Sequence, residues 1–190
     1  MIYLTKPNPE AINNFIAQQA TLPFSYKDVG ASRLTPPHGY VVDHRRVRLG
    51  EGEAVFEAAC AALRRWEMFN LGWVNICWPD TPLEEGAVVG ILARIFGMWW
   101  LNACRIVYLI DESTPIRKVG FAYGTLPDHA ALGEERFTIE WHPDNSVWYD
   151  LLAFSRPRHW LMRLGYPIAR QIQKRFGPAS LKAMQLATEI

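Results

Sequence analysis

Short apolar runs separated by turn residues fill the central part of the chain, between residues 117 and 157. Three of these runs, at 119–125, 135–142 and 147–154, are rich in β-branched and aromatic residues, and Pro, Asp, Asn and Gly stand between them. This pattern is typical of antiparallel strands that follow one another through short turns. We therefore expect a three-stranded meander at the centre of the fold.

The spacing of apolar residues changes after this meander. Ser155 can cap a helix that has Pro157 in its first turn. From there apolar residues recur three or four positions apart, at Leu161, Leu164, Ile168, Ile172 and Phe176. The sequence thus predicts a long C-terminal helix directly after the last strand, with a kink or break at the Gly-Pro pair 177–178.

The segments before the meander predict two helices and four further strands. The helices are expected at 9–19, with Asn8 as a possible cap, and at 53–66, because apolar residues fall on one face of each. The strand candidates are 39–49, 71–78, 87–96 and 104–111, and the proline-containing segment 22–37 reads as a loop.

The order of these elements indicates a fold class. A strongly curved antiparallel sheet needs an apolar element across its concave face, and the C-terminal helix is the only predicted element long enough. We therefore expect an α+β helix-grip fold, in which a curved antiparallel sheet of about six or seven strands wraps around the C-terminal helix. Residues 1–190 are expected to form a single domain, in which 1–38 are an N-terminal helix and loop extension. The space between the sheet and the helix is where a small molecule would bind.

Composition narrows the class of protein. A chain of 190 residues with 49% hydrophobic content can bury one large core, and its net charge of +1 does not call for a nucleic-acid partner. Three cysteines without metal-ligand spacing suit buried thiols in a reducing compartment, and no secretion signal is visible, so we expect a cytoplasmic protein. The most apolar stretch, 86–110, carries Arg94 near its centre, so we expect two buried strands there and no transmembrane segment.

Three segments carry a resemblance to a known family. They are NACRIVYLIDE from Asn102, GFAYGTLPDHAALGEERF from Gly120 and VWYDLLAFSRP from Val147. In this order they closely resemble the DUF1990 (UPF0548) proteins, and the resemblance extends over most of the chain. It implies the START-like, Bet v 1-type helix-grip superfamily, whose members mostly bind apolar small molecules and sometimes catalyse reactions on them. The resemblance implies no particular catalytic residue.

The turn at 143–146 suggests a register for the last hairpin. If Pro143 lies opposite Ser146, then Trp141 lies opposite Trp148, and alternate residues of the two strands share a face. We expect that face to be the one toward the core. Its members are Phe137, Ile139, Trp141, Trp148, Asp150, Leu152 and Phe154.

Asp150 is the only charged residue on the face expected to meet the core. A buried carboxylate must be paired, hydrogen-bonded or protonated, so Asp150 is a candidate general acid or base, or a polar anchor for a ligand. Alternatively, it forms a structural pair with Arg94, Arg105 or an arginine of the C-terminal helix. A slip of one residue in the hairpin would turn it outward.

Further candidates complete the expected site. Tyr123 can offer its hydroxyl to a ligand and assist catalysis, although a buried Tyr often has a structural partner. Tryptophans 141 and 148 either line an aromatic pocket or fill the core. The expected ligand-binding residues are thus Tyr123, Trp141, Trp148, Asp150 and Arg105. The alternating small residues Gly120, Ala122 and Gly124 leave one strand face bare, so that a helix or a ligand can approach it closely.

Two other clusters allow a functional and a structural interpretation. The acidic and imidazole groups of 126–135 (Asp128, His129, Glu134, Glu135) would suit a divalent cation, but they also fit a turn and ion pairs with Arg136 or Arg117. We expect no metal and no cofactor. The segment 156–182 is basic and contains no acidic residue, so the C-terminal helix either makes a weak contact with an anionic surface or partner, or is a solvated face.

Three functions remain open from the sequence. The first is a protein that binds an apolar small molecule between the sheet and the C-terminal helix. The second is an enzyme that acts on such a molecule, with Asp150 as acid or base and Tyr123 assisting. The third is a partner-binding or membrane-surface-binding protein with a filled core.

Overall fold

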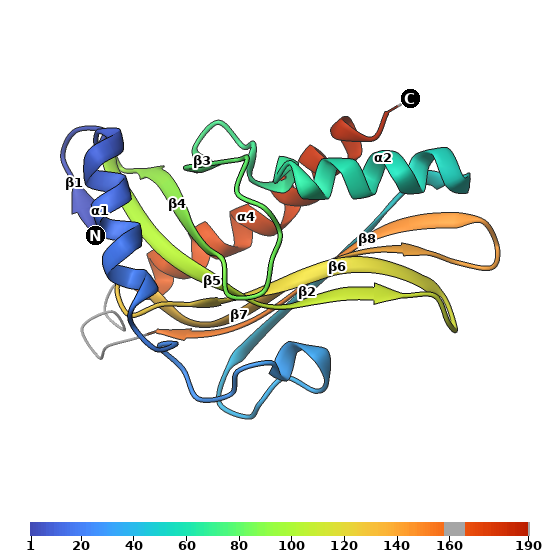
Figure 1. Ribbon diagram of the computed structural model, residues 1–190, viewed down its shortest axis with the longest axis horizontal. Coiled ribbons are helices and arrows are strands. Elements are labelled where there is room, and N and C mark those ends of the chain that lie inside the picture. Colours follow the sequence, from blue (N-terminus) through green and yellow to red (C-terminus); the bar gives the residue numbers. More distant parts are fainter. Residues whose placement is uncertain (158–165, 190) are drawn as a thin grey trace.

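The computed structural model describes residues 1–157 and 166–189, and it consists of one curved sheet with helices packed on both sides (Figure 1). The strands are β1 (Ile2–Tyr3), β2 (Val41–Glu51), β3 (Val74–Ile76), β4 (Val88–Ile95), β5 (Met98–Glu112), β6 (Arg117–Thr125), β7 (Ala131–Trp141) and β8 (Ser146–Pro157). The helices are α1 (Pro9–Ala20), α2 (Gly52–Arg64) and α4 (Tyr166–Ala187), with short 3-10 helices η1 (Ala31–Arg33) and η2 (Glu67–Phe69).

The sheet follows the order β2-β8-β7-β6-β5-β4-β3, and every neighbouring pair in it is antiparallel. The short strand β1 also pairs with β5, and its two residues are too few for the sequence pattern to reveal. α4 crosses the concave side of the sheet (Figure 1). The predicted helix-grip fold is therefore confirmed, including the three-stranded meander, which is β6, β7 and β8.

The start of the C-terminal helix differs from the prediction. β8 continues to Pro157, whose Cα lies opposite that of Ala131 in β7, so Ser155 belongs to a strand and caps no helix. The predicted helical positions Leu161 and Leu164 lie outside the described residues. α4 runs without a break through Pro178. The predicted break at this position is thus wrong, because a single proline removes only one backbone donor from a helix of 22 residues.

The main core lies between the concave face and the elements that cover it, which are α2, η2 and α4. Large side chains fill its α2 end: Phe56 and Leu63 from α2 meet Phe121, Phe137 and Tyr149 from the sheet, and all five are almost fully buried. The thiols of Cys60, Cys77 and Cys104 are free. No helix in the described part of the chain is both long and apolar enough to cross a membrane, and segment 86–110 contributes to β4 and β5 as predicted.

A second, smaller cluster attaches α1 to the convex face. Ile12 and Phe15 of α1 pack against Leu92 of β4 and Leu101 of β5. The predicted cap is confirmed, since the Asn8 side chain accepts a hydrogen bond of 2.8 Å from the backbone nitrogen of Ala11. The helix thus has a fixed start and a buried face, although it lies outside the main core.

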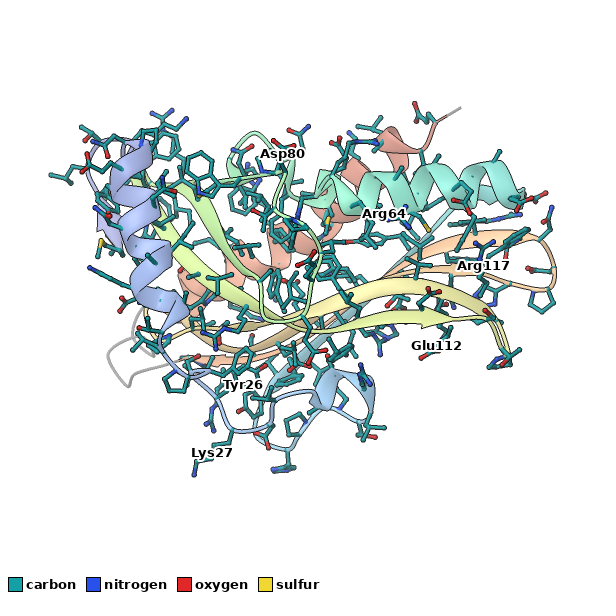
Figure 2. The ribbon with its side chains drawn as sticks, in the orientation of Figure 1. Tyr26, Lys27, Arg64, Asp80, Glu112 and Arg117 are labelled. Atoms are coloured by element: carbon teal, nitrogen blue, oxygen red, sulfur yellow. The ribbon has the colours of Figure 1, made fainter. Side chains whose placement is uncertain are left out.

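The loop after α1 lies on the convex side of the sheet, opposite α2 and α4 (Figures 1 and 2). Glu134 of β7 anchors this loop, because its carboxylate accepts hydrogen bonds from the Tyr26 hydroxyl (2.6 Å), from the Gly30 nitrogen (2.7 Å) and from Ser32. A Cβ atom at Gly124 would lie 2.8 Å from ring carbons of Tyr26. The bare strand face thus admits a tyrosine at Gly124, where a helix or a ligand was expected.

Candidate ligand-binding cavity

A cavity of about 470 Å³ lies between the concave face of the sheet and the first half of α4. This volume falls within the range of small-molecule sites in proteins. The wall comes from β2, from β4 to β8, from η2 with β3, from the loop after β6, and from α4. It is mostly apolar and includes Phe69, Trp73, Val74, Ile91, Ala93, Ile95, Leu151, Ala153, Ile172 and Phe176.

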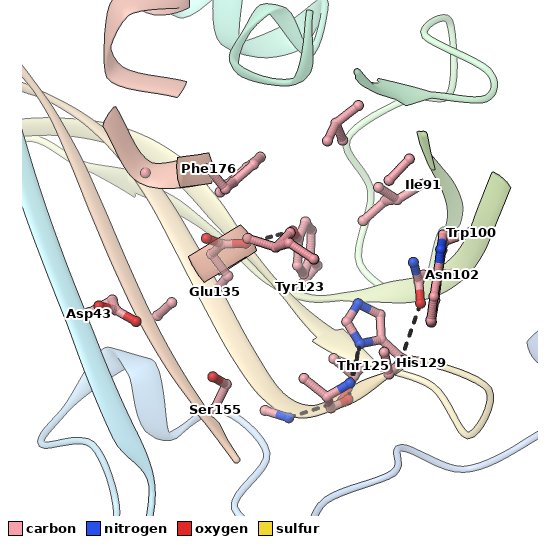
Figure 3. A pocket seen from close by; sticks show the side chains of 18 of the residues that line it. Asp43, Ile91, Trp100, Asn102, Tyr123, Thr125, His129, Glu135, Ser155 and Phe176 are labelled. Carbon is pink, nitrogen blue, oxygen red and sulfur yellow. Dashed lines mark hydrogen bonds between the residues drawn. The ribbon is translucent and has the colours of Figure 1, made fainter. Parts of the chain in front are cut away.

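A hydrogen-bonded pair of polar side chains lies on the sheet wall of this cavity (Figure 3). Tyr123 of β6 and Glu135 of β7 are cross-strand neighbours, and the Tyr123 hydroxyl donates a hydrogen bond of 2.6 Å to Oε2 of Glu135. Burial raises the pKa of Glu135 from 4.5 to about 7, with a smaller contribution from Asp43, while the bond from Tyr123 opposes the rise. Burial and the adjacent Glu135 raise the pKa of Tyr123 well above its usual range, so Tyr123 remains a donor at neutral pH.

Charged side chains connect β2 with α4 beside the cavity. The guanidinium of Arg170 contacts both carboxylate oxygens of Asp43, one of them at 2.7 Å. A Cβ atom at Gly177 would lie 2.5 Å from Cδ of Arg45, so a glycine at this position lets α4 lie close against that side chain. Both contacts hold α4 across the concave face.

A third polar group lies on the wall formed by β5 and the loop after β6 (Figure 3). Oδ1 of Asn102 accepts a hydrogen bond of 3.3 Å from the backbone nitrogen of Ala130. Nδ1 of His129 lies 3.0 Å from both the backbone nitrogen and the oxygen of Ala131, and burial lowers the pKa of His129 to about 4, so the ring is neutral at pH 7. Nε1 of Trp100 is buried and has no hydrogen-bond partner among residues 1–157 and 166–189.

The register predicted for the last hairpin is wrong by one residue. Trp141 lies opposite Val147, and Thr138 lies opposite Asp150. The hairpin has a three-residue loop at 143–145, in which Asn145 adopts a left-handed conformation with φ of 70°. A loop of this kind adds one residue to the expected two-residue turn, and this exchanges the two faces of β8.

Asp150 consequently lies on the convex face, across the sheet from the cavity. It is 4% exposed, and its carboxylate lies 2.6 Å from Nε2 of His44 and 3.2 Å from Nη2 of Arg136. It is thus a paired buried carboxylate, but its partners differ from the arginines expected. Trp148 shares this face, where its ring lies 4.6 Å beneath the guanidinium of Arg46.

Among the predicted ligand-binding residues, Tyr123 lines the cavity and the other four do not. Trp141 is on the concave face, but it packs against Phe56 of α2 at the filled end of the core, with ring centroids 5.6 Å apart. Arg105 is on the convex face and donates hydrogen bonds to the carbonyl oxygens of Ala20 (2.8 Å) and Leu22 (2.9 Å). A cation there satisfies the free carbonyls at the end of α1.

The acidic groups of the loop after β6 diverge. Asp128 accepts a hydrogen bond of 2.8 Å from the Gln19 side chain, whereas Glu134 binds the loop on the convex face and Glu135 binds Tyr123 inside the cavity. Neither glutamate pairs with Arg117, which lies 3.3 Å from Glu57. In the described ranges, no three His, Cys, Asp or Glu side chains are grouped closely enough to hold a metal ion.

Several residues of the basic segment interact within the fold. Arg170 binds Asp43, and the guanidinium of Arg175 lies 4.6 Å from the ring centroid of Trp73. Lys174 and Lys182 are exposed. Arg158 and Arg163 lie outside the described residues. Part of the positive charge of this segment therefore holds α4 on the sheet.

The sequence reasoning missed the cavity residues Trp100, Asn102 and Glu135 as ligand contacts, and it considered His129 only as a metal ligand. A signal for Glu135 was present, because it lies two positions before Phe137 on the alternating face of β7 that was expected to meet the core. No comparable signal marks His129, which belongs to a loop.

Comparisons with known proteins agree with this fold. The profile of the family described as "Domain of unknown function (DUF1990)" matches residues 25–183. The chain is 39% identical over 188 residues to a UPF0548 protein of Deinococcus radiodurans, covering 92% of each chain. It is 36% identical over 195 residues to a UPF0548 protein of Dictyostelium discoideum, covering 93% of this chain and 90% of that protein.

One solved structure shares the fold at low sequence identity. A hypothetical protein from Helicobacter pylori superposes with a TM-score of 0.55 and 11% identity, over 83% of this chain and 94% of that chain. The family is established by the two closer kinds of match, since the profile spans most of the chain and the relatives exceed 30% identity over nearly their whole length. The chain therefore belongs to the DUF1990 (UPF0548) family.

Proposed function

We propose that this protein binds an apolar small molecule in the cavity between the sheet and α4. The observation that carries this proposal is the cavity itself, with its volume of about 470 Å³ and its mostly apolar wall. Protein interiors are normally packed so closely that few voids exceed the size of a water molecule. A space of this size therefore costs stability unless it has a use.

The residue types on the wall support the same proposal. Small residues line the cavity where the sheet passes beneath α4, notably Ala93, Gly133 and Ala153. At the α2 end, the equivalent space is occupied by large side chains such as Phe121 and Phe137. One half of the same concave face is thus filled while the other half is left open, as a binding site requires.

The first experiment is native mass spectrometry of the protein purified from its own host, followed by extraction and identification of the bound molecule. A defined apolar compound at one per chain is the expected result. A variant that fills the cavity provides the control: Ala153→Phe should abolish this binding because the new ring projects from the middle of β8 into the cavity. Ala54→Phe, the same change on the exposed side of α2, should leave it intact. An unoccupied wild-type protein, or equal binding by both variants, would contradict the proposal.

A second candidate function is proton transfer on the bound molecule. Glu135 favours it, because a carboxyl whose pKa is raised to about 7 can take up and release a proton near neutral pH. With a ketone in the cavity, ionised Glu135 would remove a proton from the carbon beside the carbonyl. The electron pair of the broken C–H bond would form the enolate, and return of a proton from Glu135 to carbon would regenerate a ketone. Tyr123 would hold Glu135 in position through its hydrogen bond of 2.6 Å.

This second function has its own test. An apolar methyl ketone, 2-acetylnaphthalene, is incubated with the protein in D2O, and the loss of its methyl proton signal is followed by NMR. Catalysis by Glu135 predicts exchange above the solvent rate, and loss of that exchange in Glu135→Gln. Equal exchange rates with and without Glu135 would leave binding as the function of the cavity.

A further inference from the structure

We infer that the bound molecule carries an uncharged acceptor oxygen, such as a ketone or ester carbonyl, and that this oxygen binds at a donor wall formed by Trp100, Asn102 and His129. The inference rests on the proposed function and specifies the chemical class of the ligand. It also orients the ligand, with its polar end at β5 and the loop after β6, and its apolar part toward Phe69 and Phe176.

The indole of Trp100 supplies the main observation. Nε1 is a donor that cannot accept, it is buried, and no group in the described residues bonds to it. Nearly all buried polar groups in proteins have a hydrogen-bond partner, and leaving one unpaired is destabilising. Because Trp100 lines the cavity, an acceptor on the ligand can satisfy this donor.

Asn102 and His129 surround the same place. Asn102 lies two residues after Trp100, so both side chains project from the same face of β5. Its Oδ1 is occupied by the nitrogen of Ala130, which leaves Nδ2 as the amide group available to a ligand. His129 is held through Nδ1 at Ala131, and the other side of its ring faces the cavity (Figure 3).

The charges around the cavity argue for a neutral acceptor over a carboxylate. Trp100 and Asn102 carry no charge, and burial lowers the pKa of His129 to about 4, so this wall has no cation at pH 7. The one basic side chain among the described lining residues, apart from the neutral His129, is Arg45, and it lies against Gly177 of α4. A ligand carboxylate at the donor wall would be desolvated without a counter-charge, and this is unfavourable.

The test compares three ligands with the same apolar ring system: naphthalene, 2-acetylnaphthalene and 2-naphthoate. Their dissociation constants are measured by equilibrium dialysis at pH 7.5, for the wild type and for two matched variants. Trp100→Phe removes the donor and keeps an aromatic ring. Trp99→Phe makes the same change at the adjacent residue, which packs in the cluster on the convex face.

The wild type should bind the ketone about three- to tenfold more tightly than naphthalene, as one hydrogen bond to a buried donor provides, and more tightly than naphthoate. This ratio should fall to near one in Trp100→Phe and persist in Trp99→Phe. Equal binding of ketone and hydrocarbon by the wild type, tighter binding of naphthoate, or an unchanged ratio in Trp100→Phe would overturn the donor wall and leave the binding function in place. Failure of all three compounds to bind would count against the cavity as a ligand site and therefore against both proposals.

Discussion

Tyr123 and Glu135 face each other across β6 and β7, and the hydrogen bond of 2.6 Å between them lies on the wall of an otherwise apolar cavity. Both groups are held away from water, and burial raises the pKa of each. The pair consequently behaves differently on the two sides of neutral pH. Below pH 7 the carboxyl is mainly neutral, and above it the cavity holds a carboxylate.

The first prediction concerns the pH dependence of stability. The pKa of Glu135 is about 7 in the folded protein and 4.5 as the reference value. Between these values the folded state holds a proton that the unfolded state has released, so stability falls as the pH rises. The contribution is complete below pH 4.5 and is lost as the pH rises through about 7, by at most about 3 kcal/mol for this pKa difference.

The comparison with Glu135→Gln isolates this contribution. The glutamine has a similar shape and does not titrate, so the wild type should lose stability relative to the variant between pH 4.5 and pH 8. Urea unfolding at a series of pH values measures the difference. Parallel stability curves for the two proteins would show that Glu135 titrates normally in the folded state.

The second prediction is that Tyr123→Phe shifts the titration of Glu135 upward. The Tyr123 hydroxyl favours the ionised carboxylate, and it opposes the effect of burial on the pKa of Glu135. Without this donor, the pKa should rise above its wild-type value. NMR titration of ¹³C-labelled glutamate carboxyl groups reports the midpoint directly, with Glu135→Gln to assign the signal. A midpoint that stays in place or moves downward would contradict the role given to Tyr123.

Asp150 and Glu135 show which part of the site the sequence could predict. The alternation of β7 correctly placed Phe137 and Ile139 toward the core, and one further step along the same strand would have placed Glu135 beside them. The face of β8 depended on the loop at 143–145, where a single residue in a left-handed conformation reverses the alternation. Local turn chemistry decided that outcome, and the hydrophobic pattern alone did not reveal it.

The architecture was more accessible than the site. Strand order and the covering helix follow from long segments whose periodicity tolerates an error of a residue or two at each end. The donor wall joins β5 to a loop more than 20 positions away, and the unpaired nitrogen of Trp100 becomes visible only when both are packed. Arg105 is similar, because its partners are carbonyl groups at the end of α1.

The third prediction separates Asp150 from the cavity. Asp150→Asn removes the negative charge beside the guanidinium of Arg136, at 3.2 Å, and should cost about 2–4 kcal/mol of stability because a largely buried cation loses its counter-ion. Affinity for a cavity ligand should remain within about twofold, since this carboxylate lies on the convex face. Urea unfolding and equilibrium dialysis of 2-acetylnaphthalene measure the two effects. Asp80→Asn, the same change at an exposed position, is the control for stability. A large loss of affinity with little loss of stability would return Asp150 to the binding site.

The last prediction tests the attachment of the N-terminal loop. At Gly124→Ala the new methyl group would lie 2.8 Å from ring carbons of Tyr26 and nearer still to its hydroxyl, so the ring must move. This movement breaks the hydrogen bond of 2.6 Å from Tyr26 to the buried Glu134 and should cost about 2 kcal/mol, as overpacking in a core does.

A double-mutant cycle identifies the cause of that cost. In a Tyr26→Ala background the methyl group meets no ring, so Gly124→Ala should be close to neutral in urea unfolding, and the two changes should be strongly non-additive. Additive costs would mean that the glycine is needed for the strand itself. Non-additivity would show that the bare face of β6 serves to admit Tyr26, and hence that the loop after α1 is packed as part of the fold.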